Sequence, residues 1–169
     1  SCSVKRRRKK QFLYNKKEYE RLADHIGRIP LVLVSPSDSS LISEGSDERR
    51  RFMDIIISQY NREYLDNLIS YNSALKSRNA MLKNNDGIDE TMLEVFDEKL
   101  CANAAPIFRE RTEFITNFIP VFKDFYRRIS NKKEEVDLRY LSSLEHTELR
   151  DKLLQSRAKD KYLGFTTAG

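Results

Sequence analysis

The sequence predicts an α+β fold, in which a small strand-containing body carries an inserted pair of long antiparallel helices. Short strand-like runs occur near both ends of the 169 residues, whereas the middle repeats apolar residues at spacings of three and four. A reversal signal, Asn84-Asn85-Asp86-Gly87, divides this middle part in two. We therefore expect strands and a short helix in residues 1–45, a helical arm in residues 46–133, and a strand, a helix and a strand in residues 134–169.

The first of these stretches contains three predicted elements. A hairpin is expected over residues 4–19, because two strand-like runs flank a polar turn at residues 15–17. A short helix should follow over residues 21–26 and end at Gly27. Residues 29–34 form an apolar, β-branched run bounded by Pro30 and Pro36, which is typical of a buried strand. The turn-rich segment that comes next contains one helical turn around Leu41 and Ile42.

The helical arm begins where Ser46 or Asp47 can cap a helix, with acidic residues in its first turn. We expect a pause near residues 59–61 before the helix resumes. The resumed helix has a coiled-coil-like seam of Leu65, Leu68, Asn72, Leu75, Asn79 and Leu82. The second helix carries the matching stripe of Leu93, Phe96, Leu100, Asn103, Ile107, Phe114, Phe118, Val121 and Phe125.

The asparagines Asn72, Asn79 and Asn103 on these stripes could fix the register by pairing across the seam. Pro106 and Pro120 should bend the second helix, since each lacks an N–H and crowds the preceding turn. The seam is expected to be structural, although exposed parts of the arm could contact another protein.

The last stretch returns to strand patterning. Residues 134–141 alternate apolar and polar side chains and predict a strand. Residues 145–162 predict a helix that Gly164 closes, and residues 165–168 should open a final strand. The chain starts at Ser1 rather than at Met and stops directly after this β-like run, so we expect it to be part of a longer protein.

The search for catalytic and cofactor motifs finds none. No GxxxxGK[ST], GxGxxG or GxSxG is present, and neither His25 nor His146 has a partner at metal-ligand spacing. Cys2 and Cys101 lie far apart, which favours two free thiols in a reduced cytoplasm. No apolar run approaches the ~18 residues that cross a bilayer, so no membrane partner is expected. This chain alone should bind no cofactor and catalyse nothing.

The positive charge of the chain is concentrated near its start. Residues 1–28 hold ten Lys and Arg against three acidic residues, although the net charge of the whole chain is only +5. A local basic patch indicates a polyanion partner. The candidate DNA-binding residues are Lys5, Arg6, Arg7, Arg8, Lys9 and Lys10. Few aromatic residues lie nearby to stack on bases, so contacts to the DNA backbone are favoured. The alternative is a solvated edge strand.

A second basic group, Arg49, Arg50 and Arg51, lies in the first turn of the expected helix at residue 46. Cations are unfavourable at that end of the helix dipole, so something should compensate for them. An anion bound at the helix N-terminus would do so. The local alternative is an ion pair with Asp47 or Glu48, or a hydrogen bond to a carbonyl of the preceding loop.

Several short pieces in fixed order resemble the RecF family of bacterial recombination mediators, which belong to the ABC/SMC-like ATPase class. The pieces are Val34-Ser35-Pro36-Ser37-Asp38 with Leu41, Ile42 and Gly45; Glu48-Arg49-Arg50-Arg51-Phe52-Met53-Asp54; Tyr71 with Leu75-Lys76-Ser77-Arg78-Asn79 and Leu82; Phe96-Asp97-Glu98-Lys99-Leu100; and Gly164-Phe165-Thr166-Thr167-Ala168-Gly169. Each piece is weakly specific, but their order and spacing make the resemblance fairly specific. It covers nearly the whole chain.

The resemblance implies that the intact protein is a DNA-binding ATPase that requires ATP and Mg and forms an ATP-dependent homodimer. Its partners would be gapped DNA, or a junction of single and double strands, together with RecO and RecR, and it would help to place RecA on that DNA. Residues 1–45 would then be part of the ATPase head, and residues 46–133 its helical second lobe. The nucleotide-binding motifs of the class are not in this chain.

By position, the turn from Ser35 to Asp38 resembles the junction between head and arm, where this ATPase class carries a nucleotide-sensing loop. No Gln occupies the turn here. The candidate residues for an anion site or for this junction are Ser35, Asp38, Arg49, Arg50 and Arg51. A rival interpretation is a non-catalytic interaction module, in which the helical hairpin docks a partner and the basic strand is incidental.

Overall fold

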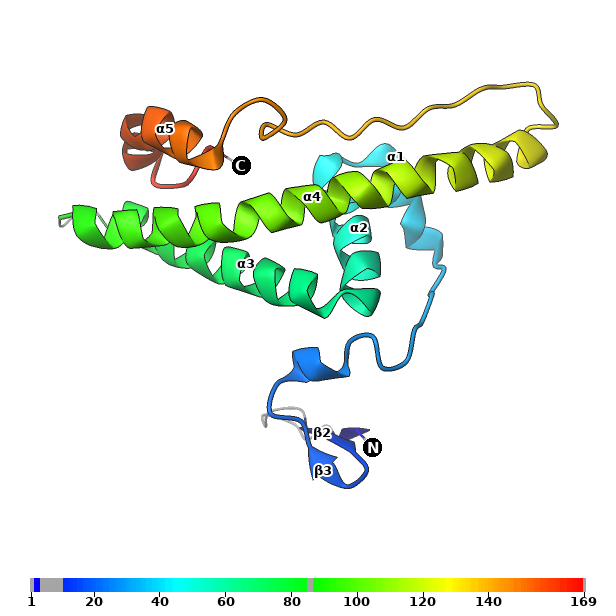
Figure 1. Cartoon of the computed structure of the whole chain (residues 1–169), viewed down its shortest axis with the longest axis horizontal. Helices are drawn as coiled ribbons and strands as arrows, with labels where there is room; N and C mark the ends of the chain where they lie inside the picture. The colour runs from blue at the N-terminus through cyan, green and yellow to red at the C-terminus, as the bar shows by residue number, and fades with distance from the viewer. Residues whose placement is uncertain (1, 4–10, 85–86, 169) are drawn as a thin grey trace. The chain divides into compact units, whose positions relative to one another are not determined.

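The computed structural model describes residues 2–3, 11–84 and 87–168, which form two compact units, residues 1–65 and 66–169 (Figure 1). The described part is mostly helical, with one small antiparallel sheet in the order β1-β2-β3. None of its helices is long and apolar enough to cross a membrane. The α+β expectation is thus confirmed in coarse outline, with far less strand than the sequence predicted.

The predicted hairpin is present. Strand β2 (Gln11–Tyr14) pairs with β3 (Lys17–Glu18), and the short β1 (Cys2–Ser3) pairs with the other edge of β2. The two turn residues, Asn15 and Lys16, have φ angles of 48° and 68°. Such a pair of left-handed residues gives the backbone the twist that a two-residue hairpin needs. The candidate DNA-binding run, residues 5–10, lies outside the described residues.

The predicted short helix is a single 3₁₀ turn, η1 (Leu22–His25), and Gly27 follows it with a φ of +82°. A Cβ on Gly27 would lie 2.2 Å from the backbone oxygen of Gln59, so a side chain does not fit there. Glycine is required at this position for two reasons, the left-handed backbone and the close approach to another segment.

The expectation of a buried strand over residues 29–34 is wrong. The segment forms no regular element, and Leu31, Val32, Leu33 and Val34 are 69–85% exposed. Its side chains are apolar on both faces, a pattern that is buried only when other elements cover both sides. Among the described residues, no strand pairs with it. The amide of Leu31 instead donates to the side-chain oxygen of Gln59, 3.0 Å away.

The helices that follow agree with the sequence, apart from a cap. The expected helical turn is α1 (Ser40–Ser43), which follows the 3₁₀ turn η2 (Pro36–Ser39). Helix α2 (Ser46–Tyr60) has Gly45 at its N-cap, so neither Ser46 nor Asp47 is the cap. The predicted pause is at Asn61, whose side-chain oxygen accepts a hydrogen bond from the amide of Tyr64 at 2.9 Å. That bond caps α3 (Arg62–Lys83).

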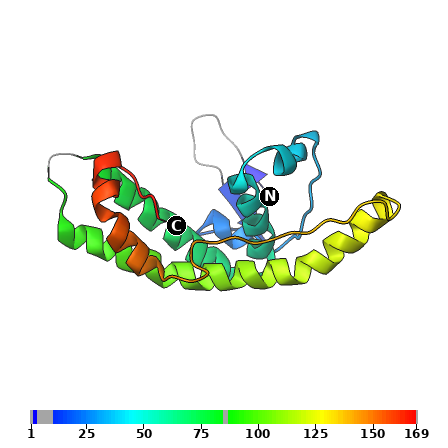
Figure 2. The same cartoon turned by 90° about the horizontal axis from the view of Figure 1, so that it is seen from above.

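Helix α3 is followed by α4 (Glu90–Ile129), and the two run antiparallel as expected (Figure 1). The core of the second unit lies where α3, α4 and α5 (Leu149–Leu163) meet. It consists of Ala74, Leu100, Ala104, Leu149 and Leu153. Helix α4 continues through Pro106 and Pro120, and Figure 2 shows it as one curved rod.

The expected asparagine pairs do not form. Asn72 is exposed. Asn103 donates across the seam to the hydroxyl of Ser70 at 3.1 Å, while Asn79 accepts hydrogen bonds from Thr166. The seam is therefore bridged by one asparagine–serine contact, because the other two asparagines face solvent or a different segment.

The strand expected over residues 134–141 is also absent, although its alternation is real. The segment runs back along α4 (Figure 2), and Val136, Leu138 and Tyr140 are half-buried while their neighbours are exposed. Asp137 forms an ion pair with Lys123 of α4 at 2.8 Å, and the ring centroids of Tyr140 and Phe108 lie 6.0 Å apart. One face of this extended segment therefore packs on a helix instead of pairing in a sheet.

Helix α5 starts at Leu149, four residues later than predicted, and ends at Gly164, whose φ is +74°. The left-handed glycine confirms the predicted stop. Residues 165–168 form no strand in the structure, contrary to expectation. Their polar groups bond to helix side chains instead.

Candidate functional site

Two of the predicted junction residues, Ser35 and Asp38, stabilise the turn η2. Ser35 is the N-cap, and its hydroxyl accepts from the amide of Ser37 at 3.3 Å. In return, the carboxylate of Asp38 accepts from the amide of Ser35 at 2.8 Å. This reciprocal capping box fixes the loop before α1. The two residues thus have a clear structural role, and nucleotide sensing stays a prediction.

The three arginines at the start of α2 each contact a nearby acceptor. Arg49 donates to the carbonyl oxygens of Leu41 and Glu44, both at 3.0 Å. Arg50 forms an ion pair with Asp47, and Arg51 lies 3.7 Å from Glu48. These contacts are the local compensation that the sequence offered as an alternative to a bound anion. The anion site stays a prediction.

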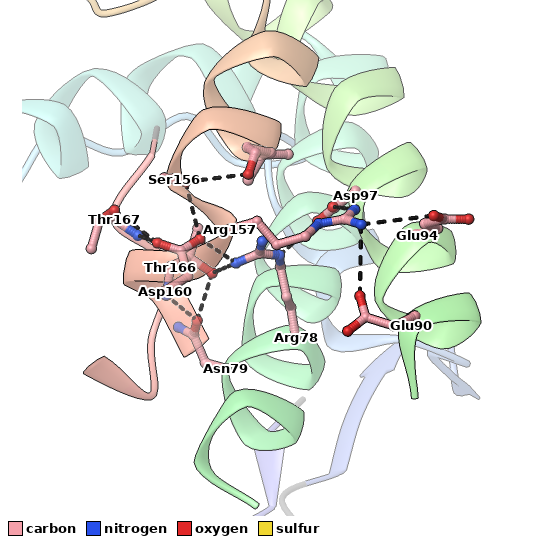
Figure 3. Close-up of polar contacts among 11 residues, drawn as sticks. Arg78, Asn79, Glu90, Glu94, Asp97, Ser156, Arg157, Asp160, Thr166 and Thr167 are labelled. Atoms are coloured by element: carbon pink, nitrogen blue, oxygen red, sulfur yellow. Dashed lines mark hydrogen bonds and ion pairs between the residues drawn. The ribbon is translucent and has the colours of Figure 1, made fainter. Parts of the chain in front are cut away.

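The most deeply buried polar group in the described residues was not predicted. Arg78 of α3 has an exposed fraction of 0%, as has Asp160 of α5, and Asp97 of α4 is 9% exposed. The Nε of Arg78 donates to Asp97 at 2.6 Å, and its Nη1 donates to Asp160 at 2.8 Å (Figure 3). One guanidinium therefore ties three helices together.

The same guanidinium reaches the segment after α5. Nη1 of Arg78 also donates to the hydroxyl of Thr166 at 2.8 Å. Asn79 accepts from both the amide and the hydroxyl of Thr166, at 2.8 and 2.7 Å. Asp160 accepts from the amide and the hydroxyl of Thr167, at 2.9 and 2.7 Å (Figure 3).

A second arginine, Arg157, contacts acidic residues of α4. Arg157 of α5 donates to Asp97 at 2.8 Å and lies 3.7 Å from both Glu90 and Glu94 (Figure 3). The hydrogen bond to Asp97 raises the pKa of Arg157, with Glu90 and Glu94 adding to the rise. The hydroxyl of Ser156 donates to Asp160 at 3.1 Å. We call this group the Arg78 cluster; its members are Arg78, Asn79, Asp97, Ser156, Arg157, Asp160, Thr166 and Thr167.

The Arg78 cluster can position segments but has no groups for chemistry of its own. Its two arginines and two aspartates neutralise each other, and Nη2 of Arg78 is buried without a hydrogen-bond partner among the described residues. No group of His, Cys, Asp and Glu in the described part is placed to hold a metal ion. One sequence signal could have revealed the cluster: Arg78 lies between Ala74 and Leu82 on the buried face of α3.

A shallow hollow beside the core is lined by Cys101, Ala104, Phe108, Leu144 and His146, among others. Cys101 is a free thiol. Burial raises the pKa of this thiol above its ordinary value, partly opposed by the charge of Arg150. A thiol with a raised pKa is mostly protonated at neutral pH, so Cys101 lacks the activation that a nucleophilic cysteine needs.

No family model matches the chain, but curated proteins do. It is 53% identical to the DNA replication and repair protein RecF of Bacteroides fragilis over 168 residues, which cover 99% of this chain and 45% of that protein. It is 52% identical to RecF of Phocaeicola vulgatus over 168 residues, with the same coverage. Against RecF of Porphyromonas gingivalis the identity is 49% over 156 residues, which cover 92% of this chain and 43% of that protein. The chain thus spans about half the length of these relatives.

Two solved structures have the same fold. The recombination mediator protein RecF-ATPrS in the RecFOR pathway superposes with a TM-score of 0.88 at 28% identity, covering 99% of this chain and 48% of that one. The RecF-ATP structure gives 0.85 at 28% identity, covering 95% and 46%. The predicted resemblance is confirmed: over nearly its whole length, this chain is related in sequence and in fold to a part of RecF.

Proposed function

We propose that this chain is the middle segment of a RecF-like DNA-binding ATPase that helps to load RecA at single-strand gaps, together with RecO and RecR. The observation that carries the proposal is the 53% identity to a DNA replication and repair protein over 99% of the chain. The chain would supply part of the ATPase head in residues 1–45 and 134–169 and the helical second lobe in residues 46–133.

Two segments with strand-like sequence but no strand partner among the described residues support the idea that this chain is completed by further sequence. The exposed apolar run at residues 29–34 has the composition of a strand buried on both faces. The extended segment at residues 134–141 has strand alternation but no strand partner among the described residues. Each would gain a neighbour if the rest of the head formed a sheet beside it.

The nucleotide would be bound by the longer protein and not by this chain. The two solved relatives are RecF-ATP and RecF-ATPrS, whereas this sequence contains no GxxxxGK[ST] motif. ATP with Mg would then hold two copies of the longer protein together. Isothermal titration of this chain and of the longer protein with ATP tests the assignment. Micromolar binding by this chain alone would contradict it.

DNA contact is proposed for the basic run at residues 5–10. If alternate side chains of the run face DNA, about three phosphate contacts form, and log K should fall with log salt at a slope of about −2.7. Fluorescence anisotropy with a gapped duplex measures that slope. Charge reversal of Lys5, Arg7 and Lys9 should abolish most of it.

The matched control reverses three exposed basic residues elsewhere, Arg109, Lys133 and Lys159, which changes the net charge by the same amount. If both triple variants lose the same affinity, only net charge matters and the run is not the site. If neither loses affinity, DNA binds elsewhere or not at all.

A second candidate function, a non-catalytic interaction module, is favoured by one feature of α4. Val121, Phe125 and Ile129 recur every four residues on this helix and are 51%, 59% and 79% exposed. An apolar stripe of this kind is typical of a protein contact. Capture of a partner that survives high salt, combined with no DNA binding by the longer protein, would favour this function over the first.

A further inference from the structure

The segment after α5 is held in an unusual way for extended chain. We call residues 164–168 the strap. Its two consecutive amides, of Thr166 and Thr167, donate to side chains, Asn79 of α3 and Asp160 of α5. The threonine hydroxyls donate to the same two acceptors. In a sheet these amides would bond to the backbone of a neighbouring strand. Here side chains of the helices take that place.

The contacts also connect the strap to α4 through Arg78. The hydroxyl of Thr166 accepts from Arg78, whose Nε is bonded to Asp97 of α4 at 2.6 Å. A continuous series of charge-assisted hydrogen bonds thus runs from Asp97 of α4 through Arg78 to the strap. Hydrogen bonds to charged groups are shorter, stronger and more restricted in geometry than neutral ones, especially in a buried site.

We propose that the Arg78 cluster is a coupling joint that makes the strap and the α3–α4 pair move as one body. Arg78 is the positioning residue of this joint, and Asn79 and Asp160 are the anchors of the strap. In the longer protein, the joint would link nucleotide-dependent movement of the head to the helical arm, and this consequence rests on the proposed function.

Thr166→Val tests the joint without destroying the buried charges. The substitution keeps the side-chain shape and the Arg78 pairs with Asp97 and Asp160, but removes the hydroxyl bonds to Arg78 and Asn79. Hydrogen exchange of the strap amides should become about tenfold faster, as expected for the loss of two hydrogen bonds, while exchange in α3 and α4 stays unchanged. Thr112→Val, which removes one hydroxyl bond on the exposed face of α4, is the matched control and should leave the strap unchanged.

A second measurement follows the joint in the longer protein. If ATP alters DNA affinity there, Thr166→Val should leave ATP affinity intact and reduce the effect of ATP on DNA affinity by at least about threefold. An unchanged exchange rate in the strap overturns the joint itself. An unchanged ATP effect, with the strap loosened, overturns its role in coupling. If ATP has no effect on the DNA affinity of the wild-type protein, both the proposed function and the coupling role of the Arg78 cluster are contradicted. The exchange rates of the strap amides still decide whether the cluster holds the strap.

Discussion

Replacement of Arg78 by methionine should strongly destabilise the second unit. Methionine fills a similar volume but leaves Asp160, whose exposed fraction is 0%, as a buried carboxylate without a cation. Asp97 keeps its contact with Arg157 at 2.8 Å, so only one of the two aspartates loses its counterion. Removal of one partner of a buried ion pair costs about 3–5 kcal/mol. For a chain of this size, that corresponds to a fall in Tm of roughly 6–20 °C.

Urea denaturation followed by circular dichroism measures the free energy of unfolding. Arg109→Met is the control, because Arg109 is 69% exposed and its nearest carboxylate is 3.7 Å away; its effect should stay within about 0.5 kcal/mol. Addition of Asp160→Asn to Arg78→Met should recover part of the loss, since a neutral side chain no longer needs a counterion. A loss below about 1 kcal/mol for Arg78→Met, or a double variant less stable than the single one, would refute the reasoning.

Three further predictions concern single positions. Gly27→Ala should lower the free energy of unfolding by about 1–3 kcal/mol, because its Cβ would meet a backbone oxygen at 2.2 Å in a left-handed backbone. In the same urea titration Gly45→Ala, with nothing within 4 Å of its Cβ, should cost less, at most the roughly 1 kcal/mol by which Ala is a poorer N-cap than Gly for α2. In a chain with Cys2→Ser, iodoacetamide should alkylate Cys101 more slowly at pH 8 than in urea, because burial raises the pKa of that thiol; equal rates would contradict this. The hydrogen bond from Lys123 lowers the pKa of Asp137. The stabilisation from this contact is therefore fully present above the ordinary pKa of 3.8 and is lost as the pH falls through the lowered pKa. In an NMR titration, Lys123→Met should move the titration midpoint of Asp137 up toward 3.8.

The helices could be predicted from the sequence because their signals are local. The break at Asn61, the reversal before α4 and the stop at Gly164 each depend on residues next to the boundary. The strands at residues 29–34 and 134–141 were predicted wrongly because a strand exists only through its partner. Both segments have strand composition, but in the described residues one is uncovered and the other packs on a helix.

The candidate site shows the same division. The arginines at the start of α2 contact local acceptors, which the sequence offered as one of two alternatives. The Arg78 cluster joins residues up to 88 positions apart, and no local pattern pairs Arg78 with Asp97, Asp160 or Thr166. Only the apolar neighbours of Arg78 on its helix face marked it as unusual. Long-range polar contacts are specified by the fold, so they can be recognised only after the fold is known.

The two prolines give α4 an uneven stiffness. All of its buried residues, from Leu93 to Ile107, lie at or before the first turn after Pro106. Beyond this point, roughly 35 Å of helix has no buried residue and is braced by the extended segment along one side. Each proline removes one backbone hydrogen bond of the helix, and the helix bends most easily at such a position. The helix is therefore anchored in the core at one end, and a bend at Pro120 in its other part would displace no buried residue of α4.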